Sequence, residues 1–88
     1  MRNTNINAVL NMVREYLDGE MDSISFQLDF PYEIEQRYRK MMRENPDYAE
    51  MIYFYLVEQG TDLAEEMSDA DFKKLIQKQF DNVMDGVY

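Results

Sequence analysis

The sequence predicts an all-α protein, and three observations support this prediction. Apolar residues recur at spacings of three and four along most of the chain, as they do in amphipathic helices. Residues that begin or end helices stand at the borders of these segments. One stretch, residues 24–30, alternates as a strand would, but no second strand is available to pair with it. We therefore expect a compact antiparallel bundle of four to five helices.

The first helix is expected over residues 6–17. Asn5 can cap its N-terminus, and Gly19 can stop it in the left-handed conformation that glycine adopts readily. Its apolar stripe consists of Ile6, Val9, Leu10, Val13, Tyr16 and Leu17.

Residues 24–30 are ambiguous, because their apolar side chains alternate in the sequence and also pair four residues apart. We interpret the stretch as a short helix or turn-like segment opened by Asp22 or Ser23. Pro31 suits the first turn of a following helix, where its missing N–H is no loss. That helix should end near Asn45. Its apolar face consists of Ile34, Tyr38, Met41 and Met42, and its outer surface is basic, with Arg37, Arg39, Lys40 and Arg43.

Asn45 followed by Pro46 predicts the start of a helix that runs to Gln59, with Gly60 in a left-handed stop. Apolar residues lie on nearly every side of this helix rather than on one stripe. It is therefore either the central helix of the bundle or a helix that lends a face to a partner.

The C-terminal part of the chain predicts a short turn and a last helix. The turn is expected from Thr61 to Met67, and the segment from Ser68 to Asp71 is similar to a capping box. Gly86 follows the helix. The helical stripe consists of Phe72, Leu75, Ile76, Gln79, Phe80 and Val83.

The composition indicates one domain, residues 1–88, without the usual equipment of an enzyme. A chain of 88 residues with 45% hydrophobic residues forms one small core. It contains no cysteine and no histidine, so thiolate nucleophiles, disulfides, Cys-based zinc sites and the usual general base are missing. The serines, Ser23, Ser25 and Ser68, have no histidine to activate them. We expect no enzyme and no cofactor.

Two further classes are disfavoured by simple sequence criteria. The carboxylates do not follow an EF-hand loop, so we interpret Asp69, Asp71, Asp81 and Asp85 as cap and surface residues and expect no metal. No run of about 18 apolar residues is present, and the N-terminus has no apolar core followed by a cleavage site. We expect a cytoplasmic protein that does not bind to or cross a membrane.

The distribution of charge is the feature that points to a partner. The formal net charge is −9, which disfavours direct binding to nucleic acid. The segment from Glu44 to Asp71 contains nine carboxylates and no Lys or Arg, whereas the acidic and basic residues of the remaining chain cancel. Such a segment either is a well-solvated surface or meets a positively charged protein.

Candidate contact residues follow from this segment. Tyrosines supply contact area at low entropic cost, and Tyr48 and Tyr55 are the candidate anchors. Tyr16, Tyr38 and Tyr53 lie on expected apolar stripes and are interpreted as core residues. Met41, Met42 and Met51 are interpreted as adaptable core residues that could line a groove. The candidate charge contacts are Asp47, Glu50, Glu58, Asp62, Glu65 and Glu66.

Three features follow one another along the chain: a first helix ending in Tyr16-Leu17-Asp18-Gly19-Glu20, a segment with Phe26 and Phe30, and an acidic helical second half. Their order resembles the small bacterial immunity proteins of the colicin D-like group. It implies an antiparallel helical bundle that binds the catalytic domain of a cognate toxin, a nuclease acting on transfer RNA. Acidic side chains would then take the place of substrate phosphates and cover the active site. No contact residue of that family is assigned to a position here.

Two other functions remain open from the sequence. One is a scaffolding or regulatory module that forms a homodimer through the apolar surface of residues 46–59. The other is an acidic mimic of nucleic acid that binds DNA-binding proteins, which requires a longer array of carboxylates than one small bundle offers. The expected oligomeric state is a monomer or a weak homodimer.

Overall fold

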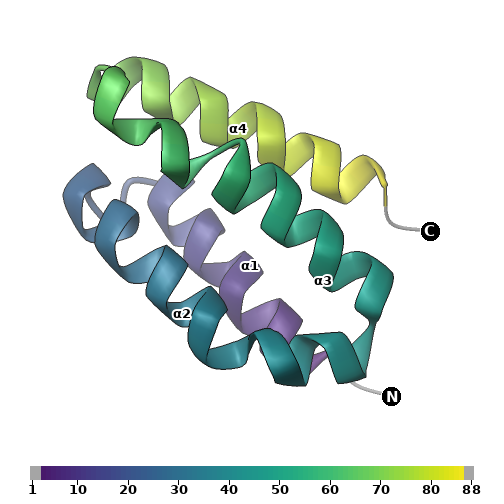
Figure 1. Cartoon of the computed structure of the whole chain (residues 1–88). Helices are drawn as coiled ribbons and strands as arrows, with labels where there is room; N and C mark the ends of the chain where they lie inside the picture. The colour runs from purple at the N-terminus through teal and green to yellow at the C-terminus, as the bar shows by residue number, and fades with distance from the viewer. Residues whose placement is uncertain (1–2, 87–88) are drawn as a thin grey trace.

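Six helical segments make up residues 3–86, the part of the chain that the computed structural model describes (Figure 1). The α-helices are α1 (Thr4–Leu17), α2 (Ser23–Glu44), α3 (Pro46–Ile52) and α4 (Asp69–Asp85). A π-helical segment, η1 (Tyr53–Glu58), follows α3, and a 3-10 segment, η2 (Thr61–Glu66), precedes α4. None of the described residues lies in a strand, so the all-α prediction is confirmed.

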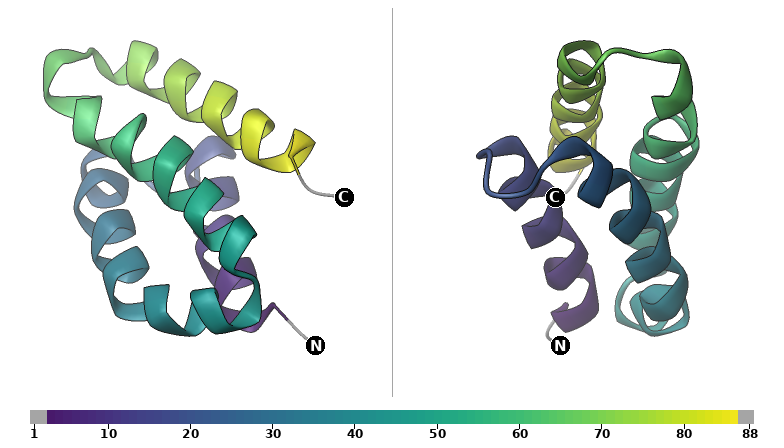
Figure 2. Two further views of the ribbon diagram at one scale, coloured as in Figure 1. Left: turned by 45° about the vertical axis from the view of Figure 1, so that its right-hand side comes forward. Right: turned by 90° about the vertical axis from the view of Figure 1, so that its left-hand side faces the viewer.

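The helices pack around one shared hydrophobic core (Figures 1 and 2). α1 packs against α2 and α4, while α3 and η1 run on as one rod beside α2 and α4. The radius of gyration is 12.1 Å, close to the value of about 12 Å expected for a folded chain of this length. The rod formed by α3 and η1 therefore has a neighbour on two sides and leaves its remaining surface open.

Stacked aromatic rings join three of the helices in the core. The Tyr16 ring of α1 stacks on Phe26 of α2 with centroids 4.4 Å apart, and Phe26 stacks on Phe30 at 4.9 Å. Phe72 of α4 lies 5.8 Å from the Tyr16 ring. The Tyr16 hydroxyl lies 3.1 Å from the Ser23 hydroxyl, so its polar end is satisfied at the start of α2. This cluster fixes the N-terminal half of α2 against α1 and α4.

α2 corrects the expectation that residues 24–30 and the helix after Pro31 are separate segments. Asp22 caps a single helix of 22 residues, with its side chain accepting a hydrogen bond from the Ser25 N–H at 2.7 Å. Pro31 lies inside this helix, not in its first turn. An internal proline costs about 3 kcal/mol, but burying Phe26 and Phe30 contributes about 1.5–3 kcal/mol each. Core burial outweighs the local penalty.

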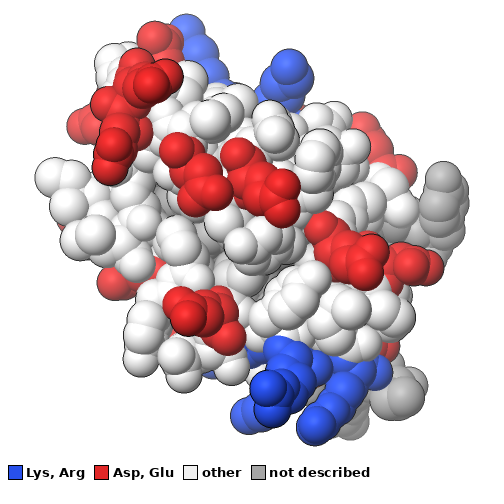
Figure 3. Space-filling view, in the orientation of Figure 1, with Lys and Arg blue, Asp and Glu red and all other residues white. Residues whose placement is uncertain are grey.

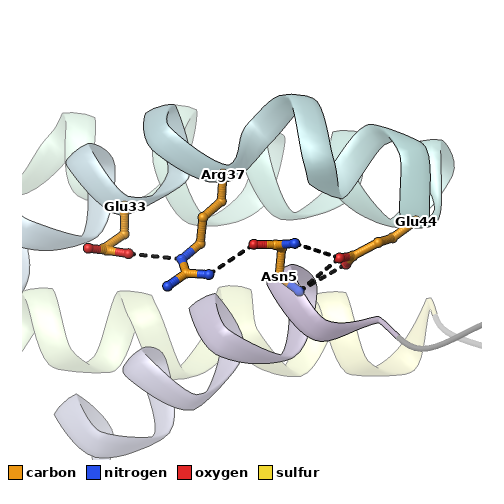
Figure 4. A network of polar contacts seen from close by, with 4 residues as sticks. All are labelled: Asn5, Glu33, Arg37 and Glu44. Atoms are coloured by element: carbon orange, nitrogen blue, oxygen red, sulfur yellow. Dashed lines mark hydrogen bonds and ion pairs between the residues drawn. The ribbon is translucent and has the colours of Figure 1, made fainter.

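The start of α1 is held by a carboxylate from the end of α2 rather than by the expected cap Asn5. Asn3 occupies the cap position and makes no side-chain cap hydrogen bond. Instead, the Glu44 carboxylate accepts hydrogen bonds from the Asn5 N–H at 2.9 Å and the Ile6 N–H at 3.0 Å. The Asn5 side-chain amide donates a third bond at 2.8 Å (Figure 4). These hydrogen bonds hold the start of α1 against the end of α2, although the two are far apart in the sequence.

The remaining sequence-predicted boundaries are mostly confirmed. Asn45 and Ser68 cap α3 and α4 by accepting hydrogen bonds from the N–H groups of Tyr48 and Asp71. The chain after α1 turns at Gly19, which has the expected positive φ of 87°. The helix that begins at Pro46 does run on to residue 58, but its last six residues are π-helical.

Gly60 does not adopt the left-handed conformation that the sequence analysis expected, since its φ is −130°. Glycine is required there for another reason. A Cβ atom at this position would collide with the backbone carbonyl group of Leu56 and approach the Ile76 side chain to 3.1 Å. The close approach of the chain to the end of η1 therefore excludes larger residues.

Candidate functional site

We define the acidic face as the six carboxylates that the sequence analysis singled out: Asp47, Glu50, Glu58, Asp62, Glu65 and Glu66. All six side chains are exposed, and all lie on α3, η1 and η2. Figure 3 shows carboxylates spread over this side of the molecule, with a basic group at its lower edge over the C-terminal part of α2. The segment therefore presents its charge to solvent and keeps it apart from most of the Lys and Arg side chains.

Within residues 3–86, no Lys or Arg forms an ion pair with a carboxylate of the acidic face. Among residues 3–86, the ion pair that forms joins Arg37 to Glu33, with the Arg37 Nε atom 2.9 Å from the carboxylate. This pair belongs to the network around Asn5 on the other side of α2 (Figure 4). The negative potential of the acidic face thus remains available to a partner.

A groove with a volume of about 460 Å³ lies between α2 on one side and η1 and η2 on the other, at the border of the acidic face. It is bordered by two carboxylates and otherwise mostly apolar and aromatic. Its lining residues are Pro31, Ile34, Glu35, Tyr38, Tyr53, Val57 and Asp62.

Two tyrosines that face each other form the central part of the groove. The rings of Tyr38 and Tyr53 pack edge to face with centroids 5.5 Å apart. Tyr38 is half-buried, whereas 38% of the Tyr53 surface is exposed. Ile34 and Val57 are buried beneath them, so the groove has a firm apolar base. This arrangement offers aromatic surface to an apolar side chain of a partner.

The groove lies in a negative electrostatic environment. Burial raises the pKa of the Tyr38 hydroxyl, and the nearby carboxylates of Glu50 and Glu58 and the Tyr53 hydroxyl raise this pKa further. Glu35 and Asp62 line the groove directly. Glu50, Glu58 and Asp62 of the acidic face are therefore brought together around the groove, and a positive charge placed there is favoured.

The two tyrosines predicted as anchors lie elsewhere. Tyr48 is half-buried against the core, and burial raises the pKa of its hydroxyl while Arg14 of α1 lowers it. Tyr48 is therefore directed to the core and not to the groove. Tyr55 is also half-buried against the core, with its ring 5.0 Å from that of Phe54. Neither residue lines the groove. Asp47, Glu65 and Glu66 are exposed but do not line it either.

The groove was not predicted from the sequence, and the interpretation of Tyr53 as a core residue was wrong, since its side chain is exposed. The helical pattern of residues 46–59 did contain a signal, because apolar residues on nearly every side cannot all be covered in a small bundle. The structure leaves Tyr53 and Phe54 exposed, the latter at 47%. The helix is therefore not fully enclosed. Of the methionines, Met41 is fully buried and Met42 and Met51 pack against the core.

Neither a metal site nor a membrane-spanning helix is found in the part of the chain that the structure describes. Between residues 3 and 86 there is no group of three or more Asp, Glu, His or Cys side chains arranged to hold a metal ion. No helix within the same range is long and apolar enough to cross a membrane. What the described residues do bring together is an aromatic groove and exposed carboxylates on the same side of the molecule.

No protein-family model, curated protein or solved structure matches the chain. The resemblance to the colicin D-like immunity proteins therefore stays a prediction.

Proposed function

We propose that the chain is an acidic binding protein of the immunity type, which inhibits a basic toxin nuclease by covering its active site. Its scaffold would be the antiparallel four- to five-helix bundle that the sequence predicts. The observation that carries the proposal is the acidic face: six exposed carboxylates on consecutive segments without an intervening Lys or Arg. A cleft that holds an RNA backbone is basic, and an acidic inhibitor is its electrostatic complement.

Charge alone would also suit a solvated surface, so the neighbouring groove matters to the proposal. Interfaces gain most of their binding energy from a few buried aromatic residues, while charged residues around them steer association and exclude wrong partners. Tyr38 and Tyr53 provide the first element, and Glu50, Glu58 and Asp62 provide the second. The combination favours a protein partner over free solvent.

The test compares two charge-reversal variants as bait for proteins from the organism that makes the chain. Glu58, Glu65 and Glu66 on the acidic face are changed to Lys in one variant. The control changes Glu15, Glu20 and Asp29, which are exposed outside the acidic face, and so has the same net charge. We expect the wild type and the control to capture a basic protein at low salt, and the first variant to lose it.

The captured protein is then assayed for cleavage of transfer RNA with and without one equivalent of the chain. Loss of cleavage in the presence of the wild type, and retention of cleavage with the acidic-face variant, is the expected result. Equal capture by both reversed variants would remove the acidic face from the proposal. Capture of a basic protein without inhibition would leave a binding protein that is not of the immunity type.

Homodimerisation is the second candidate, and the exposure of Phe54 beside Tyr53 on the rod is the observation that favours it. A dimer through this surface would bring two acidic faces together, which opposes association at low salt. Sedimentation velocity at several concentrations and at two salt concentrations tests this alternative. A dimer that persists at micromolar concentration in low salt, and that Phe54→Ala dissociates, would favour this function over the first.

A further inference from the structure

An exposed stripe on α2 extends the groove along the helix. Ile24, Leu28, Pro31, Glu35 and Tyr38 follow one another at spacings of four, three, four and three residues. Residues with this spacing lie on one face of a helix and form the contact stripe by which helices pack together. The last three line the groove, and Ile24 and Leu28 are each 69% exposed. The N-terminal part of the stripe is therefore open to solvent, whereas Tyr38 at its other end packs against Tyr53 of η1.

The stripe and the groove together have the dimensions of a binding site for a helix. From Ile24 to Tyr38 the stripe extends about 21 Å at 1.5 Å per residue, which matches a partner helix of about 15 residues. One wall is α2, and the other is formed by Tyr53 and Val57 of η1 and Asp62 of η2. A third helix laid between two helical walls can repeat its contacts every three to four residues, as the stripe does. The side chains of an extended strand alternate every two residues and would not match it.

The charge of the groove determines which charge a bound helix should carry. Glu35 and Asp62 line the groove, and Glu50 and Glu58 lie near its tyrosines. No Lys or Arg between residues 3 and 86 lines it. A second copy of the chain would bring another net charge of −9 to this site, so a copy of itself is a poor occupant. We propose that the groove and the exposed stripe of α2 bind a cationic amphipathic helix of the partner protein. The inference rests on the proposed function and names the part of the partner that the chain recognises.

Pro31 gives independent support for this inference. Proline is unfavourable inside a helix, and places where a sequence breaks such a local rule are commonly functional sites. Pro31 has no N–H to donate to the Gln27 carbonyl four residues earlier. That carbonyl therefore lacks the hydrogen bond that an ordinary residue at position 31 would give it. The ring of Pro31 meanwhile provides apolar surface in the groove.

The test uses a synthetic peptide of about 15 residues with Leu at heptad a and d positions and Lys at the flanking positions. Its control is a peptide of the same composition in scrambled order, which cannot form an amphipathic helix. Binding is measured by fluorescence anisotropy at low salt, and the site is mapped by backbone amide chemical shifts. We expect the ordered peptide to bind at least tenfold more tightly, with the largest shifts in residues 24–38 and 53–62.

Matched variants separate the groove from the rest of the acidic face. Tyr53→Ala removes a groove residue, and Phe54→Ala removes its exposed neighbour, which does not line the groove. We expect Tyr53→Ala to weaken binding of the ordered peptide at least fivefold and Phe54→Ala less than twofold. Neutralising Glu35 and Asp62 to Gln and Asn should weaken it more than neutralising Glu15 and Glu20 to Gln. Circular dichroism verifies that each variant is folded.

The outcomes distinguish this inference from the proposed function. Equal binding of the ordered and scrambled peptides, with no effect of Tyr53→Ala, would show that cationic peptides bind the acidic face by charge alone. The groove would then not be a binding site specific for an amphipathic helix. That result would overturn the inference and leave the proposed function standing. Failure of both peptides to bind at low salt would count against both. Chemical-shift changes confined to Glu65, Glu66 and their neighbours would likewise show that the peptide does not bind in the groove.

Discussion

Glu44 shows how one residue can join two helices. It belongs to the acidic segment by sequence, yet its carboxylate is turned inward to the start of α1 and is not part of the acidic face (Figure 4). The N–H groups at the start of a helix have no partner in the helix and carry partial positive charge, so a carboxylate suits them well. Glu44 therefore replaces the missing cap of α1.

Glu44→Gln is expected to lower the free energy of unfolding by about 1 kcal/mol near neutral pH, the ordinary effect of losing a helix cap. The glutamine keeps one oxygen acceptor but loses the charge that strengthens these hydrogen bonds. Urea unfolding measures the change. Glu15→Gln, on the exposed surface of α1, is the matched control and should change stability by less than 0.5 kcal/mol in either direction.

The pH dependence of Glu44→Gln has a defined sign. Burial of the Glu44 carboxyl opposes ionisation, but hydrogen bonds from Ile6 and Asn5 and the nearby Arg37 outweigh burial and lower its pKa from 4.5. A lowered pKa in the folded state means that the stabilisation is fully present above the pKa of the unfolded chain. It is lost as the pH falls below about 4.5 through the folded pKa. Wild type and variant should therefore approach equal stability in acid, and a constant difference from pH 7 to pH 2.5 would contradict this account.

The segment η1 and the residue that ends it show constraints at the scale of the element. The Gln59 N–H donates to the Phe54 carbonyl five residues earlier at 3.0 Å, which widens the last turns of the rod. π-Helical turns are rare and are frequently found at functional sites. In this chain η1 supplies Tyr53 and Val57 to the groove, and Gly60 allows the chain to turn closely past its end.

Gly60→Ala is expected to destabilise the protein by about 1–3 kcal/mol, the usual cost of forcing an extra carbon into a packed site. The collision is with the backbone of η1, which cannot move without disturbing the groove. Gly86→Ala is the control, because the new Cβ atom there meets the flexible end of the Met51 side chain. Thermal unfolding should give a clearly lower Tm for Gly60→Ala than for Gly86→Ala. Equal melting temperatures would mean that the close approach at Gly60 does not constrain the fold.

At the scale of the whole molecule, the surplus of negative charge opposes the compact state. The formal net charge is −9, and the ion pair within residues 3–86, Arg37 with Glu33, lies near the surface, where such pairs contribute little. A chain with so many unneutralised carboxylates on one side is less stable than its core alone would make it. This cost is consistent with a surface that is kept for a partner.

Salt is therefore expected to stabilise the free protein. Raising NaCl from about 20 mM to about 500 mM shortens the screening length from roughly 20 Å to roughly 4 Å and reduces the repulsion between carboxylates. The midpoint of thermal unfolding should rise with salt, while binding to a cationic partner weakens over the same range. A variant with Glu58, Glu65 and Glu66 changed to Gln should show a smaller rise than the wild type. A midpoint that falls with salt would indicate that attractive charge pairs dominate.

The sequence by itself determined the helical class, most helix boundaries and the location of the acidic face. These properties depend on residues close together in the chain: the spacing of apolar side chains, the caps Asp22, Asn45 and Ser68, and the charges of residues 44–71. Each is governed by interactions over a few residues, and local patterns report such interactions well.

The tertiary structure alone decided the points that depend on segments far apart. Phe26 and Phe30 could select a helix through Pro31 only because α1 and α4 offer Tyr16 and Phe72 to pack against. Glu44 could reach the start of α1 only once α1 lay beside α2. The groove likewise exists only where Tyr38 meets Tyr53. A periodic pattern tells which side chains share a face, but not which face finds a neighbour, because that depends on the free energy of packing the whole chain.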